Sequence, residues 1–173
     1  VIDADARAAL VTHVQRMRAA GLRVVELALP PECARGTFVA PTLVDLGGVG
    51  GLAHLSREVF GPVLHVVRWK AGRLDAVLDA IEASGYGLTL GLHSRIKATV
   101  DFVAERVKVG NMYVNRNQIG AVVGAQPFGG EGLSGTGPKA GGPHYLARFA
   151  TEQTVTINTA AAGGNAALLS GGE

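Results

Sequence analysis

Residues 88–114, LTLGLHSRIKATVDFVAERVKVGNMYV, carry the pattern of a strand, a helix and a second strand in direct succession. Leucines at 88, 90 and 92 alternate with small or polar residues, which is typical of a strand. The next apolar residues share one helical face: Ile96, Val100, Val103 and Val107. Gly110 ends that helix, and residues 112–114 form the second strand. Such a connection predicts parallel pairing within an α/β fold.

The region before this stretch shows the same alternation. A helix is predicted to begin after Asp3, a good N-cap, with one apolar face formed by Ala6, Leu10, Val14 and Met17. Extended segments follow at 22–29, 37–46 and 63–69, and the last is nearly all apolar, as expected when both faces of a strand are covered. A second helix is indicated by Leu74, Val77, Leu78 and Ile81. We therefore expect α/β layers with mainly parallel strands.

The chain changes character after residue 114. Residues 115–143 are dense in glycine and proline and lack periodicity, which favours a long, ordered functional loop. Residues 144–150 form a candidate short helix, and residues 154–157 a β-like segment suited to pairing with another chain.

Composition limits the function classes. The chain has 173 residues, of which 47% are hydrophobic and 17% charged, so it is expected to be globular. The net charge of +2 comes from scattered basic residues, which gives no support for nucleic-acid binding. No apolar run reaches membrane-spanning length, and Cys33 is the single cysteine, which fits a reducing cytoplasm. The chain starts without Met on a helical pattern, so we expect it to be part of something longer.

Several candidate sites have weak local support. Residues 130–135, GEGLSG, match the dinucleotide pattern G-x-G-x-x-G but lack a strand before and a helix after, so the glycines are better explained as turns. Cys33 lacks the base or helix N-terminus that would activate a nucleophile. The five histidines show no metal-ligand spacing, so no metal site is predicted.

Two short segments are suited to ligand binding. Within residues 58–62, EVFGP, the Glu58 carboxylate can accept hydrogen bonds from sugar hydroxyls and Phe60 can pack on a flat ring. Residues 120–124, GAVVG, can present consecutive backbone N–H groups to an anion, and Phe128 can wall an apolar cavity. Taken alone, the first segment reads more simply as a turn before a strand, and the second is only suggestive.

Together these segments resemble the aldehyde dehydrogenase superfamily. Residues 58–62 resemble its E-x-F-G-P motif, residues 86–88 its Y-G-L segment, and residues 127–130 with 134–135 its P-F-G-G…S-G segment, in the same order. Residues 110–124 and 126–143 are similar to the branch that oxidises glutamate γ-semialdehyde, which is in equilibrium with pyrroline-5-carboxylate. The tail, residues 156–165, is similar to the C-terminal region of bacterial bifunctional proline utilization A.

The resemblance implies a role for each matching residue. Glu58 would hold the nicotinamide-side ribose of NAD, and Phe60 would pack beside the nicotinamide. Gly120 and Ala121 would anchor the α-carboxylate and amino group of the substrate. Because Ala121 has no hydroxyl, where some relatives have serine, binding would rest more on backbone N–H groups. Phe128 would flank the aliphatic part of the substrate.

The resemblance also implies a division of the chain. Residues 1–150 would be part of the catalytic domain, residues 151–159 the oligomerisation strand of a homo-oligomer, and residues 160–173 a C-terminal tail. The family's nucleophilic cysteine and glutamate base lie upstream of the matched region, so the chain alone is expected to be inactive. FAD would serve a proline dehydrogenase domain outside it. The competing hypothesis is a stand-alone assembly module without ligand chemistry.

Overall fold

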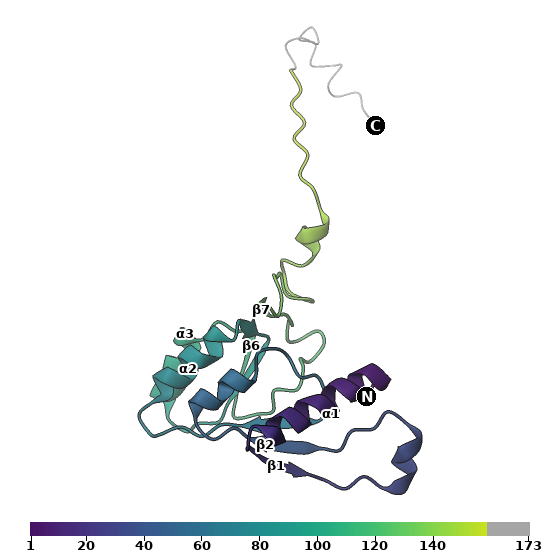
Figure 1. The fold of residues 1–173 in the computed structure, drawn as a ribbon. Helices are drawn as coiled ribbons and strands as arrows, with labels where there is room; N and C mark the ends of the chain where they lie inside the picture. The colour runs from purple at the N-terminus through teal and green to yellow at the C-terminus, as the bar shows by residue number, and fades with distance from the viewer. Residues whose placement is uncertain (159–173) are drawn as a thin grey trace.

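The computed structural model describes residues 1–158, and the predicted tail at residues 160–173 lies outside them. Two lobes lie side by side (Figure 1). The first begins with helix α1 (Ala4–Ala19), whose N-cap Asp3 accepts a hydrogen bond from the backbone N–H of Ala6 at 2.7 Å. This confirms the predicted helix start. Its buried residues are Leu10, His13, Val14 and Met17.

Helix α1 covers one face of a three-stranded sheet. Its strands are β1 (Arg23–Glu26), β2 (Thr42–Asp45) and β3 (Val63–Val66), in the order β1-β2-β3. Short 3-10 helices, η1 (Pro31–Arg35) and η2 (Val49–His54), connect them. The core of this lobe is formed by Met17, Val44 and Leu46, with partly buried residues packed around them.

No part of residues 1–158 covers the other face of this sheet, which corrects the prediction for residues 63–69. Val25, Leu43 and Leu64 are direct cross-strand neighbours, and their side chains are 45%, 36% and 60% exposed. The apolar sequence of β3 was expected to signal burial on both faces, but β3 is an edge strand and α1 supplies one layer only. A continuous apolar run therefore predicts the strand and not its surroundings.

The second lobe contains the strand–helix–strand unit of residues 88–114. It comprises β5 (Thr89–Leu92), α3 (Lys97–Arg106) and β6 (Asn111–Val114), with β5 and β6 parallel. Helix α2 (Leu74–Ala83) packs beside it around Leu78, Val103 and Val107. Arg106 of α3 forms ion pairs with Asp79 and Glu82 of α2.

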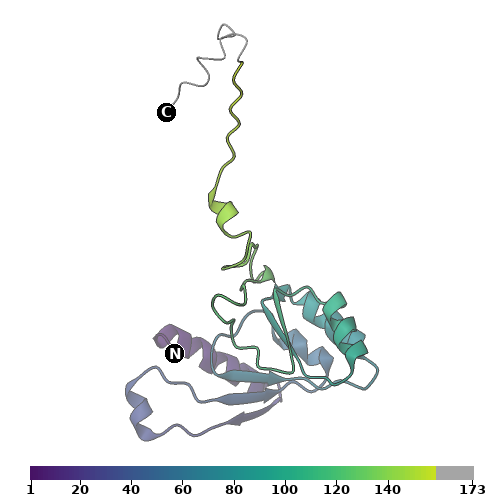
Figure 2. The same ribbon diagram turned by 180° about the vertical axis from the view of Figure 1, so that it is seen from behind.

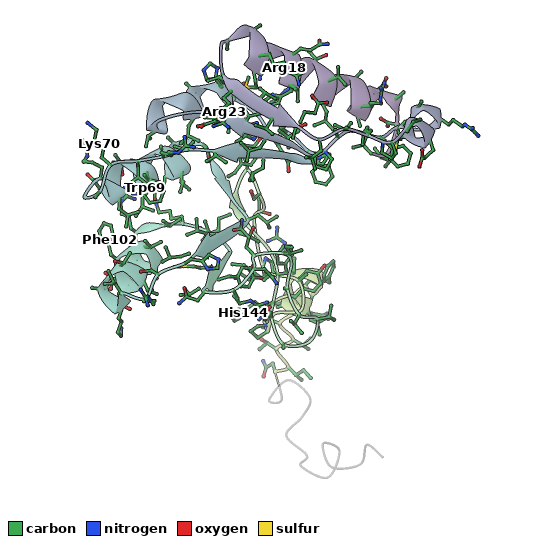
Figure 3. The ribbon with its side chains drawn as sticks, turned by 90° about the horizontal axis from the view of Figure 1, so that it is seen from below. Arg18, Arg23, Trp69, Lys70, Phe102 and His144 are labelled. Atoms are coloured by element: carbon green, nitrogen blue, oxygen red, sulfur yellow. The ribbon has the colours of Figure 1, made fainter. Side chains whose placement is uncertain are left out.

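A small antiparallel pair joins this lobe to the glycine-rich segment. It consists of β4 (Tyr86–Gly87) and β7 (Glu131–Gly132). Because β1 and β2 are also antiparallel, the pairing is mixed and not mainly parallel. The α/β class is confirmed. Viewed from below, Arg18 and Arg23 mark the first lobe, Phe102 the second, and Trp69 and Lys70 the turn that connects β3 with α2 (Figure 3).

The predicted short helix is present as η3 (Leu146–Phe149), a 3-10 turn. Beyond it, residues 150–158 extend away from both lobes (Figures 1 and 2). Residues 154–157 pair with no strand of the described chain, and Val155 and Ile157 are 70% and 74% exposed. Their pairing with another chain stays a prediction. No described helix has the length and apolarity to span a membrane.

Candidate functional site

Glu58 lies on the turn between η2 and β3. Its backbone N–H donates a hydrogen bond of 3.3 Å to the hydroxyl oxygen of Tyr86, at the start of β4. Within residues 1–158 its carboxylate has no hydrogen bond and no ion pair. The carboxylate is exposed, so both oxygens are available as acceptors for hydroxyl groups of a ligand.

A pocket of about 920 Å³ adjoins this turn. Its apolar lining includes Leu52, Leu55, Ile81, Leu88 and Leu133, and its polar lining consists of Ser56, Arg57, Glu58, His65, Ser84, Tyr86, Thr89 and Ser134. A concave site that combines apolar walls with polar groups suits a small molecule. Phe60 is 86% exposed and does not line this pocket, so its ring is open to whatever lies beyond the turn.

The second predicted segment is a loop at the carboxyl end of β6. Gly120 and Gly124 have φ values of 62° and 82°, the left-handed region that glycine adopts readily. Within the described chain, the backbone N–H groups of Ala121, Val123 and Gly124 have no acceptor. Free N–H groups in a glycine-containing turn suit an anionic ligand such as a carboxylate. The structure thus places Gly120 and Ala121 on an open loop.

Three polar side chains hold this loop and its continuation. The hydroxyl of Tyr113, on β6, donates to the carbonyl oxygen of Gly120 at 2.9 Å. The Oε1 atom of Gln126 accepts from the N–H of Val122 at 3.0 Å. Asn111 donates to the Pro127 carbonyl at 3.0 Å and accepts from a backbone N–H further along. Tyr113 and Asn111, both on β6, therefore anchor the loop and its continuation to this strand.

Phe128 is half-buried at the end of this loop. Its backbone exchanges two hydrogen bonds with Ala140, of 3.0 and 2.9 Å, so its position is fixed by a β-bridge. A second pocket, of about 700 Å³, lies beside β6 and includes Tyr113, Lys139 and His144 in its lining (Figure 3 labels His144). Phe128 lines neither this pocket nor the larger one.

The glycine run at 130–135 is a tight turn, as predicted, and not a dinucleotide fingerprint. Strand β7 lies inside the motif and no helix follows it. A Cβ atom on Gly130 would lie 2.6 Å from the Ser134 carbonyl oxygen, which explains the glycine. Ser134 accepts a hydrogen bond of 3.0 Å from the N–H of Gly87. This turn therefore ties the loop region to the wall of the Glu58 pocket.

The five predicted site residues do not share one pocket. Glu58 lines the larger cavity, whereas Phe60, Gly120, Ala121 and Phe128 line neither of the two pockets described above. The chain therefore presents two half-sites: the Glu58 turn, and the loop of residues 120–124. The glycine-rich segment of residues 129–135 connects them.

Sequence reasoning missed a pair of histidines, of which His13 is buried and His65 partly buried. His13 of α1 and His65 of β3 approach with their Nε2 atoms 2.8 Å apart, and Arg16 lies 3.3 Å from the Nδ1 atom of His13. Burial lowers the pKa of His13, and the positive charges of His65, Arg16 and Arg57 lower it further. Burial also lowers the pKa of His65. A histidine on the apolar face of a predicted helix was the signal for the first partner, and nothing in the sequence indicated the second.

Cys33 lies half-buried in η1, in the connection between β1 and β2. It was expected on a loop, and the local proline instead starts a short 3-10 turn. Cys33 lines none of the pockets described here. Among residues 1–158, no group of three or more histidine, cysteine or acidic side chains could hold a metal ion.

The sequence model of the aldehyde dehydrogenase family matches residues 1–155. The chain belongs to this family. The bifunctional protein PutA of Rhizobium meliloti is 53% identical over 155 residues, which cover 90% of this chain and 12% of the relative. The 1-pyrroline-5-carboxylate dehydrogenase 1 of Halalkalibacterium halodurans is 40% identical over 126 residues, which cover 72% of this chain and 24% of the relative.

Solved structures give the same picture. A crystal structure of bifunctional proline utilization A (PutA) superposes with a TM-score of 0.83 and 61% identity, covering 94% of this chain and 16% of that chain. The 1-pyrroline-5-carboxylate dehydrogenase from Thermus, with bound NAD, gives a TM-score of 0.72 and 33% identity, covering 86% and 28%. The chain thus spans about an eighth of the PutA relative and about a quarter of the dehydrogenase.

Proposed function

We propose that this chain is the C-terminal part of an NAD-dependent L-glutamate γ-semialdehyde dehydrogenase of proline catabolism, within a bifunctional protein that also carries a proline dehydrogenase. The observation that carries the proposal is the loop of residues 120–124, whose N–H groups at Ala121, Val123 and Gly124 lack acceptors in the described chain. They suit the α-carboxylate of an amino-acid aldehyde. Relatives named PutA and 1-pyrroline-5-carboxylate dehydrogenase support the substrate.

In this proposal the chain binds and orients both reactants. The loop holds the carboxylate end of the semialdehyde, Phe128 flanks its aliphatic part, and Glu58 accepts hydrogen bonds from ribose hydroxyls of NAD. The free Glu58 carboxylate and the open ring of Phe60 fit that cofactor. NAD, when bound, accepts the hydride from the substrate. FAD would serve the proline dehydrogenase part, outside this chain.

The nucleophilic cysteine is proposed to lie outside this sequence. Cys33 lies in η1 and lines neither of the two pockets described above. The chain by itself is therefore proposed to be inactive. A cytoplasmic setting fits a chain whose lone cysteine can form no internal disulfide.

A direct test compares this chain with an extended protein that includes the upstream region. NADH formation from glutamate γ-semialdehyde is expected in the extended protein only. Activity of the short chain would overturn the interpretation of Cys33. A folded extended protein that binds NAD but does not oxidise the semialdehyde would overturn the substrate assignment.

Assembly is a further part of the proposal. Residues 1–150 would be the partial catalytic domain, residues 151–159 an oligomerisation strand and residues 160–173 a tail. The exposed Val155 and Ile157 support this, because apolar side chains on an unpaired extended segment suit strand addition. Deletion of residues 151–173 is expected to convert the oligomer into smaller species. Light scattering would show this as a drop in particle mass much larger than the mass of the deleted residues. The assembly-module hypothesis would be favoured by two results together: this chain self-associates, and the extended protein shows no dehydrogenase activity.

A further inference from the structure

We propose that Tyr113 is a positioning residue that aims the backbone N–H groups of the 120–124 loop at the substrate, and so sets affinity for its amino-acid end. This inference rests on the proposed function and names a determinant of its specificity. Tyr113 itself touches no reacting atom. It lies on β6, its side chain is 6% exposed, and the guanidinium of Arg116 covers its ring at 4.9 Å from the centroid.

The geometry of the peptide plane links Tyr113 to the ligand-binding groups. The Tyr113 hydroxyl holds the Gly120 carbonyl oxygen at 2.9 Å. That carbonyl and the N–H of Ala121 belong to one planar peptide unit, which is trans, so they point in opposite directions. A carbonyl held toward β6 therefore turns the Ala121 N–H away from β6. Ala121 has no side-chain hydroxyl to compensate if this direction is lost.

A second contact fixes the next donor in the same way. The N–H groups of Ala125 and Gln126 donate to the Val122 carbonyl at 3.1 and 2.9 Å. The trans peptide then directs the Val123 N–H away from that turn. Gln126 Oε1 accepts from the Val122 N–H at 3.0 Å, so this group is withdrawn from the set of free donors. The N–H groups of Ala121 and Val123 are thus directed away from β6 and from the turn, the Val122 N–H is used within the loop, and the Gly124 N–H also lacks an acceptor in the described chain.

The decisive variant is Tyr113→Phe in the extended protein, because it removes the hydroxyl and keeps the ring. L-glutamate, the expected product, serves as the binding probe in calorimetry without NAD. Loss of one partly buried hydrogen bond is expected to weaken glutamate binding roughly three- to tenfold. The KM for the semialdehyde should rise by the same factor, with kcat changed by less than about twofold, as expected for lost uniform binding.

Propanal has no carboxylate or amino group and provides the internal control. Its kcat/KM should be the same in the wild type and in Tyr113→Phe. Tyr145→Phe is the matched substitution, since within the described chain Tyr145 contacts Phe149 by its ring and its hydroxyl has no partner. It should leave glutamate binding unchanged. If Tyr113→Phe does not fold, Gln126→Ala tests the same loop and should weaken glutamate binding with propanal oxidation unaffected.

The outcomes separate this inference from the proposed function. If the wild type oxidises the semialdehyde and binds glutamate, and the variants bind glutamate as the wild type does, Tyr113 has no positioning role. Equal loss of activity toward propanal would mean that the hydroxyl supports the fold in general, which also overturns the inference. If the wild type neither binds glutamate nor oxidises the semialdehyde, the proposed function itself fails, and the inference with it.

Discussion

The two half-sites differ in how firmly the chain holds them. A single hydrogen bond of 3.3 Å, between exposed groups of Glu58 and Tyr86, connects the Glu58 turn to β4. The 120–124 loop is held by the buried Tyr113, by Gln126 and by its own backbone bonds. We infer that the loop is organised before a ligand arrives, whereas the described chain holds the Glu58 turn less firmly. Pre-organisation suits recognition of a small ligand with a fixed charged end.

The largest effect on the 120–124 loop is expected from a substitution that separates β6 from the glycine-rich segment of residues 129–135. A Cβ atom on Gly110 would lie 1.7 Å from the Gly129 carbonyl oxygen, which cannot be relieved by a side-chain movement. Gly110→Ala is expected to lower the free energy of unfolding by roughly 3 kcal/mol or more. Chemical denaturation followed by circular dichroism measures this loss. Gly50→Ala, where nothing lies within 4 Å, should change little, and equal stability of both variants would contradict the packing described here.

The Glu58 half-site is tested by removing the carboxylate of Glu58. Glu58→Ala in the extended protein is expected to raise the KM for NAD by about 10- to 100-fold, since hydrogen bonds to a charged group are strong. The KM for the semialdehyde should hardly change, because the proposed function places Glu58 at the cofactor and not at the substrate. Steady-state kinetics with each reactant varied gives both values. Glu105→Ala, on the exposed face of α3, is the matched control. An unchanged KM for NAD would remove Glu58 from the cofactor site.

Acid should weaken the first lobe before the second. The pKa values of His13 and His65 are both lowered, chiefly by burial, so the unfolded chain binds more protons than the folded chain below about pH 6.5. The contribution of this pair to stability is then constant above this pH, and it falls as the pH decreases from about 6.5 toward the lowered pKa values. Thermal unfolding between neutral and mildly acidic pH measures the slope. His65→Gln should flatten it, whereas the exposed His144→Gln should not.

The smallest effect is expected at Tyr86. Its hydrogen bond to the Glu58 N–H is long and exposed, so Tyr86→Phe should raise the KM for NAD by only about two- to threefold. Tyr113→Phe should produce a larger change in the KM for the semialdehyde. The comparison between the half-sites would fail if the same Tyr-to-Phe substitution had the larger effect at Tyr86.

Local patterns were sufficient to predict much of the fold. The residues of α2, α3, β5 and β6 repeat at the period of their own element, so each could be located without its neighbours. The exposure of Leu64 could not be predicted, because it depends on how many layers cover the sheet. The antiparallel pairs also depend on the path of the whole chain and not on local periodicity.

In the candidate site, too, some residues could be predicted from local sequence and others could not. Glu58 and Gly120 were predicted as site residues because short motifs mark them. The partners that hold them were missed, since the hydroxyl of Tyr86 reaches across 28 residues and that of Tyr113 across 7. His13 and His65 are 52 residues apart. Hydrogen bonds of this kind produce no repeating pattern in the sequence, because each partner also fits the pattern of the helix, strand or loop in which it lies.

The uncovered row of Val25, Leu43 and Leu64 has a consequence for how the stability of this chain should be understood. A layer that binds this row in the folded state, and not in the unfolded state, shifts the unfolding equilibrium by mass action. Stability then ceases to be a property of the chain alone and becomes a function of the concentration and affinity of that layer. We expect a melting temperature measured on the isolated chain to be a lower bound, and an equally high value in the extended protein and in the chain alone would show that nothing binds there.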